Sequence, residues 1–161
     1  MSALAAPNLL SSDGTVAQFG IGDEYNSGGN YYKYFKSAGA IAANALCTFL
    51  GDTCVAAEGT TTTAGVIPGG YCIPQFAIGA ADEYFWAPIG PFFIKEDGTT
   101  FKVLAANAAL NVKLYTTATA GVVDDAATAG LIAGLRLTAT VAAQAATGCT
   151  ACQRLVHHCD T

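Results

Sequence analysis

The chain has 161 residues, which is enough for one domain with a hydrophobic core, with or without an extended arm. Apolar residues make up 52% of it and charged residues only 12%, about half the share of an ordinary soluble domain. The net charge of −5 argues against nucleic-acid binding, and the lack of any run of roughly eighteen apolar residues argues against a membrane span.

The low charge bears on how the surface is covered. A surface with so few charges is covered by neutral side chains or by partner proteins, and large neutral or apolar areas mark interaction sites. Abundant alanine alone also raises the apolar count, so both interpretations stay open. Met1 to Leu10 lacks the positive start and apolar core of a secretory signal, so we expect no export by that route.

The first segment, Met1 to Gly29, is predicted to be an extended arm, and residues 30–161 to be a single β-domain. Val16, Phe19 and Ile21 are the main apolar residues of the arm. Such a segment buries little surface by itself, so it is ordered by what it lies against. In an assembly it would act as a tether, and a disordered terminus is the alternative.

An aromatic segment, Tyr31 to Lys36, has strand preference and carries at least two rings on each face. One face holds Tyr31 and Phe35, and the other holds Tyr32 and Tyr34. An ordinary edge strand is the favoured interpretation. The alternative is a strand packed on the core by one face and on a neighbouring subunit by the other.

Two pieces of sequence are repeated in the chain. The similar stretches are Ile41 to Phe49 with Leu104 to Ala108 and Val141 to Ala145, and Thr60 to Val66 with Thr116 to Val122. The shared Ala-Ala-Asn-Ala predicts a tight turn, because Asn tolerates the left-handed conformation. Chance similarity in an Ala-rich chain is the alternative. Ala-rich windows also fit helices, although we expect no more than one or two helical turns there.

The second half, Tyr84 to Val141, reads as short strands joined by turns. Asp97-Gly98 predicts a two-residue hairpin, and Leu131 to Val141 alternates in one strand, with Leu135 and Leu137 on its buried face. The predicted fold class is therefore all-β. We expect a small β-barrel or β-sandwich of short antiparallel strands, with the N-terminal arm and at most a short helix.

Six cysteines invite a metal or disulfide interpretation. Cys149 and Cys152, followed by His157, His158 and Cys159, are residue types that bind zinc, but neighbouring histidines on a strand point to opposite faces. We therefore predict no metal site and no cofactor, and keep zinc as the alternative to buried thiols. A disulfide among Cys47, Cys54 and Cys72 is a further alternative, and the sequence does not choose the pairing.

Catalytic patterns are lacking. The chain contains no nucleophile elbow, phosphate loop or His-Glu-x-x-His motif, and its two histidines are adjacent. Neighbouring acidic pairs, such as Asp82-Glu83, diverge on an extended chain and fit solvated turns. We predict that the protein is not an enzyme and has no catalytic residues.

The order of parts in the second half resembles a known family. An aromatic strand with Trp86-x-x-x-Gly90, a strand before an Ala-rich turn, the turn Thr119 to Asp124 and an alternating strand are similar to the decoration, or cement, proteins of tailed-bacteriophage capsids. The resemblance covers about the second half of the chain and, more loosely, Tyr31 to Tyr71. Six cysteines and the long Tyr-rich start depart from the family pattern.

The resemblance implies a virion structural protein on the outer surface of the capsid, where it binds the major capsid protein and stabilises contacts between its subunits. It also implies a homo-oligomer, with a trimer favoured over a dimer. The net charge and the lack of a long apolar run predict no nucleic-acid or membrane partner. The residues expected to be partly core and partly interface are Tyr31, Tyr32, Tyr34, Phe35, Tyr84, Phe85 and Trp86. A secreted or surface matrix or fibre subunit is the alternative function, and a zinc-binding adaptor is a third.

Overall fold

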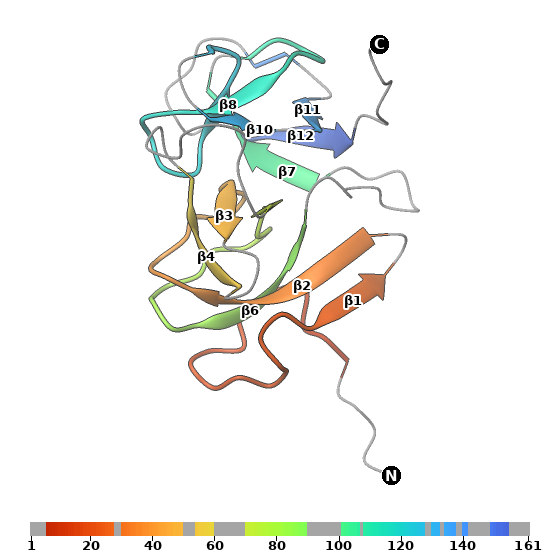
Figure 1. Ribbon diagram of the computed structural model, residues 1–161, viewed down its shortest axis with the longest axis vertical. Helices are drawn as coiled ribbons and strands as arrows, with labels where there is room; N and C mark the ends of the chain where they lie inside the picture. The colour runs from red at the N-terminus through yellow and green to blue at the C-terminus, as the bar shows by residue number, and fades with distance from the viewer. Residues whose placement is uncertain are drawn as a thin grey trace.

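The computed structural model of the protein describes residues 6–27, 30–49, 54–59, 70–89, 101–106, 108–127, 130–132, 134–137, 140–141 and 149–154. This part of the chain has no helix, and its strands form three sheets that curl into a half-barrel, so the predicted all-β class is confirmed. In Figure 1 the largest sheet forms the lower half of the molecule and the two smaller sheets lie above it.

The largest sheet contains the first six strands of the chain. They are β1 (Glu24–Ser27), β2 (Asn30–Ser37), β3 (Cys47–Phe49), β4 (Val55–Glu58), β5 (Tyr71–Cys72) and β6 (Tyr84–Pro88). One edge of β2 pairs first with β1 and then with β4, while its other edge pairs with β6. The favoured prediction of an edge strand at Tyr31 to Lys36 is therefore wrong, because β2 is paired on both edges.

The sheet curls so that β5, at the end of the strand order, contacts the end of β6. Beyond β4 come β3 and then β5, in the order β1-β2-β4-β3-β5. Cys72 in β5 forms an isolated bridge with Ile89, just after β6, and the Ile73 N–H donates to the Pro88 carbonyl (3.2 Å). Because β6 is itself paired with β2, this contact brings the two ends of the curled sheet together.

The two smaller sheets come from the second half of the chain. One contains β8 (Leu114–Thr116), β9 (Val123–Asp124) and β10 (Leu131–Ile132), and the other contains β7 (Phe101–Leu104), β11 (Leu135–Leu137) and β12 (Cys149–Arg154). The predicted hairpin turn at Asp97-Gly98 lies outside the described residues. The described partner of β7 is β12, which runs antiparallel to it.

The prediction of one alternating strand from Leu131 to Val141 is wrong. Leu131 and Ile132 pair with β8, whereas Leu135 to Leu137 pair with β12 in another sheet. Gly134 separates the two strands with a φ of 77°, a conformation that glycine adopts without a steric penalty. The alternation holds within β11, where Leu135 and Leu137 are buried and Arg136 is partly exposed.

Two hydrophobic clusters lie on the two faces of β2. Tyr32 and Tyr34 belong to the larger cluster, which extends to Leu114, Ile132 and other residues of the small sheets. Phe35 belongs to the other cluster, inside the curled sheet, with neighbours that include Phe49, Phe85 and Cys72. Tyr34 and Phe35 are fully buried. At these positions both faces of β2 are therefore covered by other parts of the same chain.

A ring of three backbone hydrogen bonds joins the two halves of the chain. The Leu46 N–H donates to the Gly121 carbonyl (2.8 Å), the Gly121 N–H to the Gly59 carbonyl (2.9 Å), and the Gly59 N–H to the Leu46 carbonyl (2.9 Å). Close by, Asn44 has a φ of 65°, so the turn expected from Ala-Ala-Asn-Ala is left-handed at this asparagine. Asn107, in the second copy, lies outside the description.

We expect Gly121→Ala to lower the free energy of unfolding by about 3 kcal/mol, from overpacking and an unfavourable backbone conformation. Gly121 has a φ of 72°, and a Cβ at this position would lie 2.5 Å from the Ala45 Cβ. Urea denaturation followed by circular dichroism measures the change. Gly39→Ala is the control, because a Cβ at Gly39 meets nothing within 4 Å. Equal stability of the two variants would contradict the role of this junction.

Candidate functional site

An aromatic cluster lies on one face of β2 and β6, with Trp86 at its centre. The Trp86 ring lies 5.0 Å from the ring of Tyr34, 5.2 Å from that of Phe19 and 6.1 Å from that of Tyr25, measured between centroids. The contacts with Phe19 and Tyr25 are edge-to-face, an arrangement that aromatic quadrupoles favour. Phe19 and Tyr25 come from the predicted arm, so the arm supplies part of the core.

The N-terminal segment, residues 10–25, is also fastened to the sheet through its backbone. The Asp13 N–H donates to the Tyr84 carbonyl (2.7 Å), and the Tyr84 N–H donates to the Gly14 carbonyl (2.8 Å). Ser12 Oγ donates to the Glu83 carboxylate (2.7 Å). The predicted arm from Met1 to Gly29 thus contains β1 and a segment bonded to the start of β6.

The hydroxyl of Tyr34 holds the middle of this segment. It donates to Asp13 Oδ2 (2.8 Å) and accepts a hydrogen bond from the Gln18 N–H (3.1 Å). Burial raises the pKa of Tyr34 to about 12, and the hydrogen bond to Asp13 acts in the same direction. No sequence pattern indicated the role of Asp13, although Ser-Ser-Asp-Gly is a typical turn sequence whose side chains bond to nearby groups.

Most of the predicted interface residues lie in the core. Tyr34, Phe35, Phe85 and Trp86 are at most 3% exposed, and Tyr32 is 7% exposed. Tyr84 is partly buried and stacks on Tyr34, while Tyr31 is 46% exposed. Within this set, Tyr31 thus offers the most surface to a partner.

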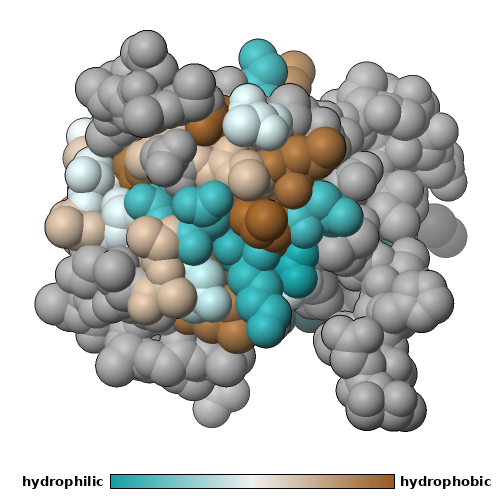
Figure 2. Space-filling model, turned by 90° about the horizontal axis from the view of Figure 1, so that it is seen from above, coloured by the Kyte–Doolittle hydropathy of each residue, from teal (hydrophilic) through white to brown (hydrophobic). Residues whose placement is uncertain are grey.

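Exposed apolar side chains gather in the N-terminal segment and at Tyr31. Six large apolar residues of the described part are exposed, and four of them, Leu10, Val16, Ile21 and Tyr31, lie between residues 10 and 31. Phe19 turns inward to Trp86 while Val16 is 68% exposed, so the apolar residues of the predicted arm are divided between core and surface. Figure 2 shows the other end of the molecule, where hydrophobic and hydrophilic atoms are interspersed over the described surface.

A pocket of about 360 Å³ opens beside the aromatic cluster. Its lining residues are Ala6, Pro7, Phe19, Asp23, Glu24, Tyr25 and Trp86. Glu24 is paired with Lys33 (3.0 Å), and Asp23 accepts a hydrogen bond from the Gly20 N–H (2.9 Å). Aromatic rings beside carboxylates suit the insertion of a positively charged side chain.

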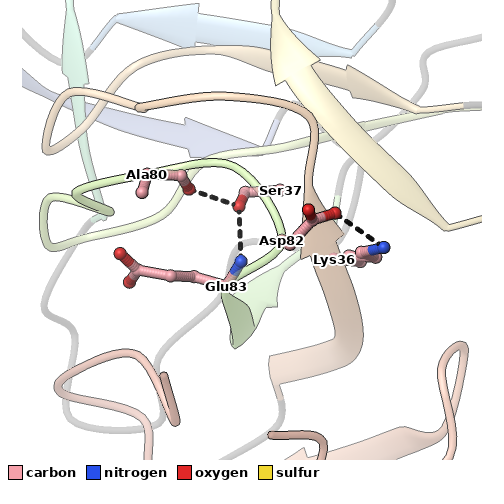
Figure 3. A network of polar contacts seen from close by, with 5 residues as sticks. All are labelled: Lys36, Ser37, Ala80, Asp82 and Glu83. Carbon is pink, nitrogen blue, oxygen red and sulfur yellow. Dashed lines mark hydrogen bonds and ion pairs between the residues drawn. The ribbon is translucent and has the colours of Figure 1, made fainter. Parts of the chain in front are cut away.

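The acidic pair Asp82-Glu83 lies in a turn that packs on the end of β2 (Figure 3). The hydroxyl of buried Ser37 donates to the Ala80 carbonyl (2.7 Å) and accepts a hydrogen bond from the Glu83 N–H (3.0 Å). Asp82 Oδ1 lies 2.7 Å from Lys36 Nζ. These contacts give the pair a structural role in joining β2 to β6.

Three buried thiols, Cys47, Cys54 and Cys72, lie in the cluster inside the curled sheet. Within the part of the chain that the structure describes, no three metal-binding side chains come together to hold an ion. Cys149 and Cys152 belong to β12, and the remaining residues of the zinc alternative, His157, His158 and Cys159, fall outside the description.

Comparison of the chain with protein-family models, curated proteins and solved structures found no match. The resemblance to capsid decoration proteins therefore stays a prediction from the sequence. The described residues include no helix long and apolar enough to cross a membrane.

We expect Tyr34→Phe to lower the free energy of unfolding by about 2 kcal/mol, because it leaves the Asp13 carboxylate and the Gln18 N–H without their shared partner. Chemical denaturation measures the loss. Tyr115→Phe on β8 is the matched control and should change stability by less than about 0.5 kcal/mol. A neutral Tyr34→Phe would show that the hydroxyl does not fasten the segment.

Stability is expected to fall as the pH rises from about 10 to 12. A tyrosine has an unfolded pKa near 10, so between these values the folded protein retains the Tyr34 proton that the unfolded chain has lost. Burial also raises the pKa of Tyr32, and the hydrogen bond to Asp82 raises that of Lys36. Tyr34→Phe should therefore reduce the slope without abolishing it. Denaturation curves across this range test the effect, which identical slopes would refute.

Proposed function

We propose that the protein is a capsid decoration, or cement, protein of a tailed-bacteriophage virion. It binds the outer surface of the head and stabilises contacts between subunits of the major capsid protein. The observation that supports this proposal best is the exposure of four large apolar side chains between residues 10 and 31, namely Leu10, Val16, Ile21 and Tyr31. We name these four residues the apolar edge. Apolar surface held out by a folded scaffold gains free energy when a partner covers it.

The way the N-terminal segment is held also supports this function. Backbone bonds to Tyr84 and the contact of Asp13 with Tyr34 fix residues 13–18 on the sheet. A surface ordered before binding loses less conformational entropy when it meets a partner. The segment expected to be a tether thus serves as a preformed contact surface on a rigid domain.

Several carboxylates of the N-terminal segment and of the turn before β6 have partners within the chain. Glu24 is paired with Lys33, Asp82 with Lys36, and Glu83 accepts a hydrogen bond from Ser12. Carboxylates that are paired in this way need no counter-charge from a partner that covers them. The pocket beside Trp86 adds a place for a positively charged side chain of the capsid subunit.

The proposed mechanism is additive burial. Each bound copy covers apolar surface on two neighbouring capsid subunits and so favours the assembled shell over its dissociated subunits. Contacts within a homo-oligomer, with the trimer favoured, would let one copy bind while its neighbours hold it near the shell, which raises the effective concentration. Many weak contacts together then give a strong increase in the heat and pressure that the head survives.

Cosedimentation with expanded, undecorated shells of the major capsid protein from the same phage tests the proposal. We expect the protein to bind with saturation at a fixed number of copies per shell and to raise the melting temperature of the shells. A monomeric protein that stays in the supernatant, and that is absent from purified particles, would refute the proposal and favour the matrix or fibre alternative.

Charged substitutions locate the proposed surface. We expect Leu10→Asp and Val16→Asp each to weaken shell binding at least about tenfold, because a partner would bury a carboxylate without a counter-charge. Leu110→Asp, in the turn between β7 and β8, is the control, because Leu110 is 52% exposed and lies outside the apolar edge. All three variants should keep the wild-type melting temperature within a few degrees. If Leu110→Asp alone reduced binding, the contact surface would lie on the small sheets.

A further inference from the structure

Two of the buried thiols face each other across neighbouring strands. Cys47 in β3 is directly opposite Cys72 in β5 in an antiparallel pair. Directly opposed residues share one face of the sheet, with Cα atoms about 4.5 or 5.5 Å apart depending on the position in the ladder. Both values fall inside the range of about 4.4 to 6.8 Å that a disulfide spans.

Cys54 is placed differently. The residue of β4 opposite Cys47 is Glu58, whereas Cys54 lies just before β4 in a left-handed conformation, with a φ of 47°. The Cys54 carbonyl accepts a hydrogen bond from the Lys36 N–H (3.1 Å), on the β2 side of β4. The Cys54 thiol belongs to the same cluster and, in addition to burial, also raises the pKa of Cys72, so the strand register that sets Cys47 directly opposite Cys72 is what favours this pair.

We propose that Cys47 and Cys72 form a cross-strand disulfide when the chain folds in the presence of a small-molecule disulfide. The two cysteine thiols exchange with one molecule of oxidant, such as oxidised glutathione. The Cys47–Cys72 bond forms, the S–S bond of the oxidant breaks, and two glutathione thiols leave with the two protons and two electrons. This inference does not depend on the proposed function.

The place of the pair suggests what the bond does. β5 has two residues, and its contacts with β3 and with Ile89 close the curled sheet. A disulfide at Cys72 would fix this short closing strand to β3 covalently. It would also hold residues 47 and 72 together in the unfolded chain, and closing this loop reduces the entropy of the unfolded state. From that effect we expect the melting temperature to rise by about 10 °C.

Burial of the two thiols determines when the disulfide can form. Both thiols are fully buried, and burial raises the pKa of the Cys72 thiol well above its ordinary value. Since the thiolate is the species that attacks a disulfide, the folded, reduced protein should react slowly with oxidised glutathione. The bond should form quickly during refolding, before the sheet closes over the two cysteines.

Peptide mapping tests the pairing in the full chain. The protein is refolded with reduced and oxidised glutathione, its remaining thiols are alkylated, and it is digested without reduction by proteases that cleave before Asp and after Glu. Digestion places the three cysteines in separate peptides, Tyr25 to Gly51, Asp52 to Glu58 and Gly59 to Ala81. Cys149, Cys152 and Cys159 fall together in a further peptide, Asp125 to Cys159. We expect the first and third peptides to be linked and the Asp52 peptide to be alkylated.

Serine variants give the matched comparison. Cys54→Ser should keep the linked peptide and the higher melting temperature under oxidising conditions, whereas Cys47→Ser and Cys72→Ser should lose both. A link from Cys54 to either partner, or full alkylation of Cys47 and Cys72 in refolded protein, would overturn the proposal. Should the last two variants fail to fold, the peptide maps of the wild type and Cys54→Ser decide the matter without them.

Discussion

The burial of β2 on both faces, together with its pairing on both edges, is the constraint on which the rest of the fold depends. Tyr34 and Phe35 are adjacent in sequence and point to opposite faces, yet both are fully buried. The face with Phe35 packs inside the curled sheet, and the face with Tyr34 packs against Trp86 and the N-terminal segment. A strand buried this way reads as a continuous aromatic run, because no face is left for polar side chains. Its two lysines, Lys33 and Lys36, keep their charged ends near carboxylates at the margin.

Burying so many tyrosines is stable only if their hydroxyl groups keep hydrogen-bond partners. Tyr34 meets this condition by taking its two partners, Asp13 and the Gln18 backbone, from the segment that covers it. These two hydrogen bonds therefore satisfy the buried hydroxyl group and also hold the segment in place. Ser37 solves the corresponding problem at the end of β2 by bonding to Ala80 and Glu83 in the turn before β6. The middle of β2 and its C-terminal end are thus each fixed by polar contacts with irregular chain.

Local sequence patterns predicted those features of the fold that neighbouring residues determine. The strand at residues 31–36, the left-handed Asn44 and the all-β class follow from side-chain shape and backbone preference, which neighbours in sequence determine. Strand partners do not follow in this way. The run from Leu131 to Val141 looked continuous because alternation says nothing about a change of sheet, and here Gly134 allows that change. The role of Asp13 was equally hidden, since its partner Tyr34 is twenty-one positions away. At the candidate site the sequence identified the aromatic residues but not which of them face outward.

The N-terminal segment connects stability with the proposed contact surface. Its inward side chains, Phe19 and Tyr25, complete the core around Trp86, and its outward ones, Leu10, Val16 and Ile21, form most of the apolar edge. Loosening the segment would therefore expose Trp86 and disorder the edge together, so selection for a firm core also maintains a preformed surface. The backbone bonds to Tyr84 hold the segment on the sheet. Its outward apolar side chains therefore stay in solvent and do not fold back onto the domain. The proposed contact surface is thus supplied by the segment that covers the aromatic face of the sheet.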